Sequence, residues 1–288
     1  MENIVYSASA FTSLALLGVL IAALVTAVSL YWHKRTNAPV LPYIAGAATW
    51  FIFAMILENI VKVPILMQEP VKNNTVLFCV IASAFAGIFE ETGRFVTFNT
   101  VMKKHTDRRS AVTYGIGHGG FEALYIILQI SITFIVLGAM ANTGDLGKVT
   151  DSMDEAAKAS LMEQLTQYSQ QTILNDIPAL IERVSAITFH ISLSVLVFAA
   201  ARQPRYRYLY PLAVFLHFAF DSLSLLYVTE TVSPMIFELI MGAGAAAVAV
   251  FAYRFYKTLP QEVGENERCM ERNGGPHKAF NTDNAAKA

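Results

Sequence analysis

The stretch AVTYGIGHGGFEALYIILQISITFIVLGAM, residues 111–140, decides the fold class of this chain. Apart from its tyrosines, it contains only two ionisable side chains, His118 and Glu122. A helix needs about 20 mostly apolar residues to cross the hydrocarbon core of a bilayer. The stretch is therefore predicted to be a membrane-spanning helix that carries two polar groups inside the membrane.

Six other segments of the chain are similarly long and apolar. They are Ala8–Trp32, Pro39–Met67, Thr75–Met102, Pro178–Ala201, Leu209–Val228 and Val232–Tyr253. Only 15% of the 288 residues are charged, and the mean hydropathy is +0.45, whereas a soluble domain is about 25% charged. We predict an all-α, polytopic membrane helix bundle of about seven transmembrane helices, located as a multi-pass protein in a prokaryotic cell membrane.

The net charge and the cysteine content exclude other classes of protein. A net charge of −1 provides no field that attracts a polyanion, so no nucleic-acid partner is expected. Cys79 lies in an apolar run and Cys269 in a polar tail, so a disulfide scaffold is excluded. The expected partners are the lipid bilayer and a membrane protein or peptide.

The loops between the spans differ in their content of lysine and arginine. One set of loops carries eleven: Lys34, Arg35, Lys103, Lys104, Arg108, Arg109, Arg202, Arg205, Arg207, Arg254 and Lys257. The alternate set carries three: Lys72, Lys148 and Lys158. Because cytoplasmic loops are the more basic ones, we expect the N-terminus outside and the C-terminus in the cytoplasm.

The chain is predicted to form one domain. Residues 1–258 are assigned to the transmembrane bundle, including an external polar loop at 141–177, and residues 259–288 to a disordered cytoplasmic tail. Within the loop, Met153–Leu165 is expected to be helical and to lie on the outer surface as a solvated cap.

The ionisable residues inside the predicted spans carry the functional information, because each is costly at membrane depth. They are Glu58, Lys62, Glu90, Glu91, Arg94, His118, Glu122, Glu182, Arg183, His190, His217 and Asp221. We interpret Glu58 and Lys62 as an intrahelical pair. Glu182 and Arg183 are interpreted as anchors at the membrane interface or as partners of a neighbouring helix.

The depth of the remaining residues places them in one layer. At a rise of about 1.5 Å per residue, His118 and His217 lie roughly 11–12 Å from the cytoplasmic face. Glu122 and Asp221 lie about 17–18 Å deep, and Glu91 and His190 roughly 16–17 Å deep. Four different helices therefore contribute to a single polar layer in the cytosolic half of the membrane, where we expect any cleavage to occur.

The helix faces on which these residues lie are consistent with a single layer. The pairs His118/Glu122 and His217/Asp221 are each four residues apart and share a helix face. Arg94 follows Glu90 by four residues and Glu91 by three, so it can hold one carboxylate ionised. Since neighbouring helix positions differ by about 100°, one carboxylate is expected to be anchored and the other reactive.

Several chemistries are compatible with this layer. A glutamate can act as general base on water, and imidazoles can orient the water or stabilise an oxyanion. The same groups can hold a metal that activates water. Alternatives outside peptidase chemistry are a proton-coupled transporter or channel that uses the buried residues as a relay, and, ranked third, a b-type haem protein.

Three short motifs resemble those of the CAAX-type and PrsW-type membrane proteases. They are Glu90-Glu91-Thr92-Gly93-Arg94, Tyr114-Gly115-Ile116-Gly117-His118 and His217-Phe218-Ala219-Phe220-Asp221. Together with Gly119-Gly120-Phe121-Glu122, Glu182-Arg183 and Phe189-His190, they most resemble the YhfC family of intramembrane peptidases. The resemblance covers roughly residues 81–221, and the spacing between Glu90 and Arg94 is one residue shorter than in the CAAX-type motif.

The resemblance implies an intramembrane endopeptidase with a site residue set of Glu90, Glu91, His118, Glu122, His190, His217 and Asp221, supported by Arg94. It implies that one of the two adjacent glutamates activates water and that His118 orients it. It also implies that His217 and Asp221 support the oxyanion or, in a metal-dependent version, act as ligands, and that His190 and Glu122 extend the site. The expected cofactor is none or a divalent metal such as zinc, for which His118, His190, His217 and Glu91 are the candidate ligands. We favour the glutamate mechanism, and the metal mechanism stays open.

Overall fold

A computed structural model describes residues 4–261 of the chain. Seven helical segments are long and apolar enough to cross a membrane. They are Ala8–Thr36, Leu41–Leu66, Thr75–Asn99, Arg108–Thr143, Ile173–Arg202, Pro204–Val228 and Pro234–Tyr256. Residues 4–261 contain no β-strand. The predicted fold class and the predicted number of spans are therefore confirmed.

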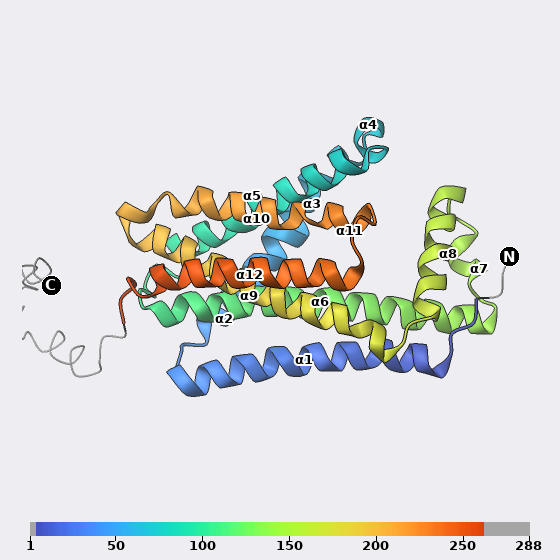
Figure 1. Ribbon diagram of the computed structural model, residues 1–288, viewed down its shortest axis with the longest axis horizontal. Coiled ribbons are helices and arrows are strands. Elements are labelled where there is room, and N and C mark those ends of the chain that lie inside the picture. The colour runs from blue at the N-terminus through green and yellow to red at the C-terminus, as the bar shows by residue number, and fades with distance from the viewer. Residues whose placement is uncertain (1–3, 262–288) are drawn as a thin grey trace, which may run out of the picture.

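Four spans consist of one long helix, and three are subdivided into shorter elements, as the order of elements in Figure 1 shows. The first span is α1 (Ala8–Thr36), and the second joins α2 (Leu41–Trp50), η1 (Phe51–Glu58) and α3 (Asn59–Leu66). After the short α4 (Glu69–Lys72), α5 (Thr75–Asn99) and α6 (Arg108–Thr143) follow. The loop contains α7 (Gly147–Thr150) and α8 (Glu155–Ser169), and η2 (Ile173–Asn175) begins the fifth span. The last elements are α9 (Asp176–Arg202), η3 (Pro204–Tyr206), α10 (Leu209–Ser222), α11 (Ser224–Val228) and α12 (Pro234–Tyr256).

Polar residues set the ends of the helices. The side chain of Asn74 accepts a hydrogen bond from the Leu77 amide at the start of α5. Asp107 accepts one from the Arg109 amide, which extends α6 beyond the apolar run that predicted it. At the other end of α6, Gly144 has φ +79°, a conformation that glycine adopts without steric cost. Capping residues therefore decide where the spans begin and end.

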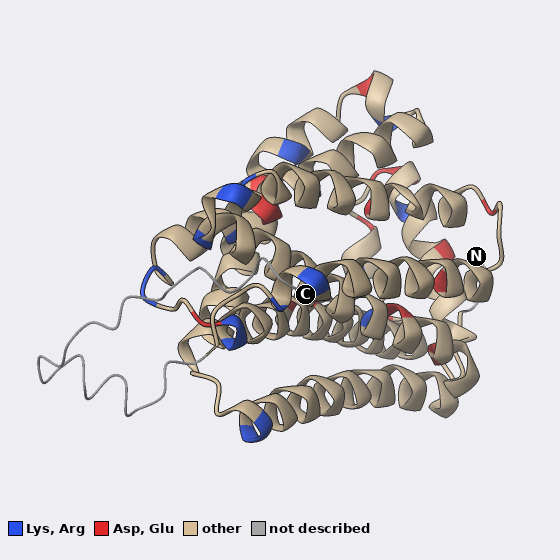
Figure 2. Ribbon diagram, turned by 60° about the vertical axis from the view of Figure 1, so that its left-hand side comes forward, with Lys and Arg blue, Asp and Glu red and all other residues tan. Residues whose placement is uncertain are grey.

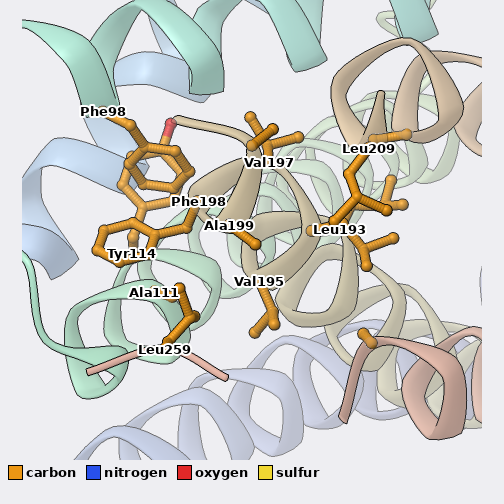
Figure 3. Close-up of a cluster of buried hydrophobic side chains, with 14 of the residues drawn as sticks. Phe98, Ala111, Tyr114, Leu193, Val195, Val197, Phe198, Ala199, Leu209 and Leu259 are labelled. Carbon is orange, nitrogen blue, oxygen red and sulfur yellow. The ribbon is translucent and has the colours of Figure 1, made fainter. Parts of the chain in front are cut away.

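Helix α9 is the central element of the bundle. It packs against α6 and α12 and also contacts α5 and α10. The largest buried cluster lies around its C-terminal half, where Phe198 contacts Phe98 edge to face at 5.1 Å between ring centroids (Figure 3). By contrast, outward-facing apolar residues such as Ile132 and Val250 are 60% and 65% exposed. A buried centre with apolar exposed flanks is what a lipid-embedded bundle requires.

The second span is irregular near its middle. Residues Phe51–Glu58 form a π-helix, and Pro64 lies within the following α3. A π-helix widens the turn, and proline lacks the amide that a regular helix needs. The consequence is that Glu58, at the end of the π segment, is only 2% exposed, and it faces the bundle interior.

The loop between α6 and α9 caps one end of the bundle, where α8 stands across the spans (Figure 1). The predicted helix at Met153–Leu165 corresponds to α8, and Leu165 is fully buried beside Phe134 and Tyr6. Residues 262–288 of the predicted tail lie outside the described residues. Leu259, which the sequence assigned to that tail, packs into the main core at 3% exposure.

Candidate active site

Helix α5 carries two adjacent carboxylates and a buried arginine. Glu91 and Arg94 are both fully buried and form an ion pair. Glu90 lies 3.7 Å from Arg94, and its side chain is 8% exposed. One carboxylate is thus anchored by the guanidinium, while the other is less tightly held. Acidic and basic residues set within the helices, as well as in the loops, are visible in Figure 2.

Helix α6 places His118 against α5. Its Nε2 atom lies 2.9 Å from Oε2 of Glu90, and the side chain is fully buried. The other ring nitrogen, Nδ1, has no hydrogen-bond partner within residues 4–261. One turn further along α6, Glu122 faces the same layer, because i and i+4 share a helix face.

Helix α9 joins these two groups through His190. An amino group of Arg94 donates to Nδ1 of His190 at 2.5 Å, and Nε2 lies 2.8 Å from Oε2 of Glu122. The helices approach closely here because a Cβ on Gly119 of α6 would lie 2.9 Å from the His190 Cβ. Any larger residue at Gly119 would push α9 away from the site.

Helix α10 completes the layer with His217 and Asp221. Nδ1 of His217 lies 2.7 Å from Oε1 of Glu91, and Nε2 lies 3.4 Å from Oδ2 of Asp221. Both ring nitrogens therefore contact carboxylates. Asp221 is 34% exposed at its side chain and is the most open member of the layer.

The structure therefore brings all the predicted site residues into one polar layer, in two connected groups. The first group holds Arg94, Glu91, His217 and Asp221. The second group holds Glu90, His118, Glu122 and His190. Adjacent imidazoles link them, with ring centroids 5.1 Å apart for His118 and His190 and 5.4 Å apart for His190 and His217.

The second group is compatible with a metal ion. Each of its four members offers a ligand atom, and these atoms all lie within 4.8 Å of one another. Two imidazoles with carboxylates form a donor set found at catalytic zinc sites. Charge is compatible with a cation as well, because Arg94 pairs with both Glu90 and Glu91, so that the two carboxylates share one buried guanidinium.

This group differs from the ligand set expected from the sequence. His118 and His190 belong to both sets. Glu91 contacts both Arg94 and His217, whereas Glu90 and Glu122 lie in the ligand group. Sequence spacing determines which residues share a layer, but the rotation of α5 decides which glutamate meets which partner.

Two ion pairs outside the predicted site lie near it. Glu58 pairs with Lys62 at 2.6 Å, as the sequence indicated, yet Glu58 also has His217 and Asp221 among its electrostatic neighbours. From the sequence, the only indication that Glu58 has a role near the site was that a carboxylate within a membrane span is energetically costly. Glu182 and Arg183 pair with each other, and the electrostatic neighbours of Arg183 include Glu122.

The chain is similar to known membrane proteins over most of its length. A family model described as YhfC intramembrane metalloprotease matches residues 18–241. The Uncharacterized membrane protein YhfC of Bacillus subtilis (strain 168) is 31% identical over 227 residues, which is 77% of this chain and 86% of that protein. No solved structure matches. These findings and the seven apolar helices support the predicted location in a cell membrane as a multi-pass protein.

Proposed function

Because the chain belongs to the YhfC family, we propose that it is an intramembrane, metal-dependent endopeptidase that hydrolyses a peptide bond of a membrane-associated protein or peptide. The observation that carries this proposal is the buried group of Glu90, His118, Glu122 and His190, drawn from three helices within 4.8 Å. Packing alone does not require such a group, because buried ionisable residues in a membrane are costly.

The residues fit a divalent cation such as zinc. Glu90, His118, Glu122 and His190 would hold it, since each offers one ligand atom to the group. Bound there, such an ion would acidify a water molecule and polarise the carbonyl of the scissile bond. A catalytic zinc site commonly uses three protein ligands, so one of the two carboxylates can serve another role.

Glu122 is suited to be the general base. Its side chain is 14% exposed, compared with 8% for Glu90, so it is the less enclosed of the two carboxylates. It takes the proton of the attacking water and transfers it to the amine nitrogen that leaves. In the structure, Nε2 of His190 lies 2.8 Å from Oε2 of this carboxylate. Because Nδ1 of His190 already accepts from Arg94, Nε2 is the nitrogen that would hold an ion, and its contact with Glu122 would then be released. If the site works without a metal, Glu90 beside His118 is the alternative base.

Arg94 and Glu91 act as positioning residues. Arg94 contacts Glu91, Glu90 and His190 from within a fully buried position. Glu91 in turn holds His217, whose second nitrogen faces Asp221. With both nitrogens engaged, His217 supports an oxyanion only if its 3.4 Å contact with Asp221 opens.

The uneven distribution of lysine and arginine among the loops predicts how the protein is oriented in the membrane. We place the N-terminus outside and the C-terminus in the cytoplasm, because the loops at the α1–α2, α5–α6 and α9–α10 connections and after α12 carry most of the lysine and arginine. The catalytic layer then lies in the cytosolic half of the membrane.

Metal content and cleavage test the proposal together. Purified wild-type protein is expected to hold about one zinc per chain. A Glu90→Gln/Glu122→Gln double variant is expected to bind zinc more than about 100-fold more weakly, because the loss of a partner outside the ligand set already costs about 10–100-fold. Cleavage of quenched fluorescent transmembrane peptides in liposomes is expected to stop with chelator and to return with added zinc. If protein shown to be free of metal still cleaves the peptides when chelator is present, the metal mechanism is overturned and Glu90 is favoured as the general base. A folded wild type without cleavage of any membrane peptide, together with pH-dependent proton flux, would favour transport instead.

A further inference from the structure

A cavity opens beside the catalytic layer, at the end of the bundle that α8 covers. Its volume is about 840 Å³, and its walls come from α1, α6, α9, α12 and the segment before α9. Leu14, Ile126 and Ile130 give it an apolar wall, while Gln167, Gln170 and Gln171 line the region near α8. Apolar walls with a few polar groups are typical of ligand-binding cavities.

Some polar groups that line the cavity have hydrogen-bond partners, and others do not. Glu182 and Arg183 of α9 bind each other through two contacts, yet Nη1 of Arg183 has no hydrogen-bond partner in the described part of the chain. Glu238 of α12 also lines the cavity. It is 7% exposed, and its Oε2 atom likewise has no partner among residues 4–261.

These groups carry an excess of negative charge. Arg183 is an electrostatic neighbour of Glu238 but forms its ion pair with Glu182, so two carboxylates share one guanidinium and Oε2 of Glu238 has no hydrogen-bond partner among the described residues. Burying an uncompensated carboxylate is costly, and a donor that reaches Oε2 removes that cost. The cavity is therefore complementary to a positively charged group, with an additional donor at Nη1 of Arg183 for an acceptor such as a carbonyl.

The cavity continues along the same helix faces as the catalytic layer. On α6, the lining residues Ile126 and Ile130 follow Glu122 by one and two turns. On α9, Arg183 precedes His190 by seven residues, so both share a face about 10 Å apart. An extended peptide covers that distance with about three residues, at roughly 3.3 Å each.

We propose that this cavity is the substrate-binding subsite of the peptidase, and that Glu238 binds a lysine or arginine side chain of the substrate about three to four residues from the scissile bond. Arg183 donates from Nη1 to a backbone carbonyl of the same segment. This inference rests on the proposed peptidase function for the identity of the ligand. Under the proposed orientation, the substrate segment enters from the external side of the membrane, although the catalytic layer lies in the cytosolic half.

Peptide binding tests the subsite without relying on cleavage. Fluorescent apolar peptides with one lysine, glutamine or glutamate in the polar flank are titrated against full-length protein that carries Glu122→Gln, in micelles. The lysine peptide is expected to bind about tenfold more tightly than the glutamine peptide, or about 1.4 kcal/mol, and the glutamate peptide more weakly still. Adding Glu238→Gln is expected to reduce the lysine preference below about twofold.

Two further variants keep the result specific. Glu163→Gln removes a charge from the exposed surface of α8 and is expected to leave the preference unchanged. Glu238→Asp retains the charge and is expected to keep most of the preference if Glu238→Gln does not fold. Equal affinity of the three peptides for the parent protein would overturn the subsite and would leave a bridging water as the partner of Glu238. The same conclusion follows if the preference survives in Glu238→Gln.

The outcome is separable from that of the proposed function. A lysine preference in a protein that never cleaves any peptide would retain the binding site and remove the peptidase. Cleavage without any lysine preference would retain the peptidase and remove the subsite.

Discussion

Replacement of Arg94 by methionine is expected to destabilise the protein more than almost any other single change in the layer. Arg94 is fully buried and contacts three functional residues. Methionine has a similar length but no charge, so the variant leaves Glu91 as a buried carboxylate that has lost its guanidinium. Arg94→Lys is the matched control, because it keeps the charge and loses only the planar donor geometry.

The magnitude follows from the burial of the pair. Removing one partner of a buried ion pair costs about 3–5 kcal/mol, because the remaining charge is uncompensated. Glu91 also contacts His217 at 2.7 Å, and a protonated His217 can supply part of the missing charge. We therefore expect the lower end, about 3 kcal/mol, for Arg94→Met. If Glu91 is changed to glutamine in the same protein, the uncompensated charge disappears.

Equilibrium unfolding in mixed micelles, followed by circular dichroism, measures these differences. Arg94→Met is expected to unfold at clearly lower denaturant than wild type. The double variant Glu91→Gln/Arg94→Met is expected to recover about 2 kcal/mol relative to the sum of the two single changes, within the range of coupling between contacting residues. Additive single effects, or an Arg94→Met variant as stable as wild type, would refute the argument that the guanidinium compensates Glu91.

Two further predictions concern the frame that holds the site. Burial alone raises the pKa of Asp107, but hydrogen bonds from Arg109 and Ser110 outweigh it and hold that pKa below its ordinary value. Asp107→Ala is therefore expected to lower the free energy of unfolding by about 1 kcal/mol at neutral pH. This difference from wild type is expected to disappear as the pH falls through the pKa of Asp107 in the folded protein, when unfolding is measured from about pH 7 downward. Gly119→Ala places a Cβ 2.9 Å from the His190 Cβ and is expected to weaken zinc binding about tenfold or more. Gly242→Ala, whose Cβ meets only a hydroxyl at 3.3 Å, is expected to leave zinc binding unchanged, and equal effects of the two changes would contradict the close-approach argument.

The spans and the polar layer could be predicted from the sequence. Apolar runs of membrane length indicate the helices, and the rise per residue converts position into depth. For this reason, His118, His190 and His217 could be placed at related depths from their positions in the chain alone. The shared faces of His118 with Glu122 and of His217 with Asp221 follow from helix periodicity.

The pairing of the residues could not be predicted in the same way. Whether Arg94 anchors Glu90 or Glu91 depends on how α5 is rotated against α6 and α10, and that rotation is a result of packing. The pair of Glu58 with Lys62 was predicted, but the proximity of Glu58 to His217 and Asp221 was not, because Glu58 ends a π-helical segment whose irregular turn the sequence does not reveal. The subsite around Glu238 needs the juxtaposition of α9 and α12, which no spacing within one helix encodes.

The most direct test of the proposed peptidase function compares protein N-termini in membranes of cells that produce either the wild type or the Glu90→Gln/Glu122→Gln double variant. With both proteins folded and equally abundant, we expect new N-termini within or beside membrane spans in the wild-type sample alone. Identical sets of N-termini in the two samples would contradict the claim that this buried layer hydrolyses peptide bonds.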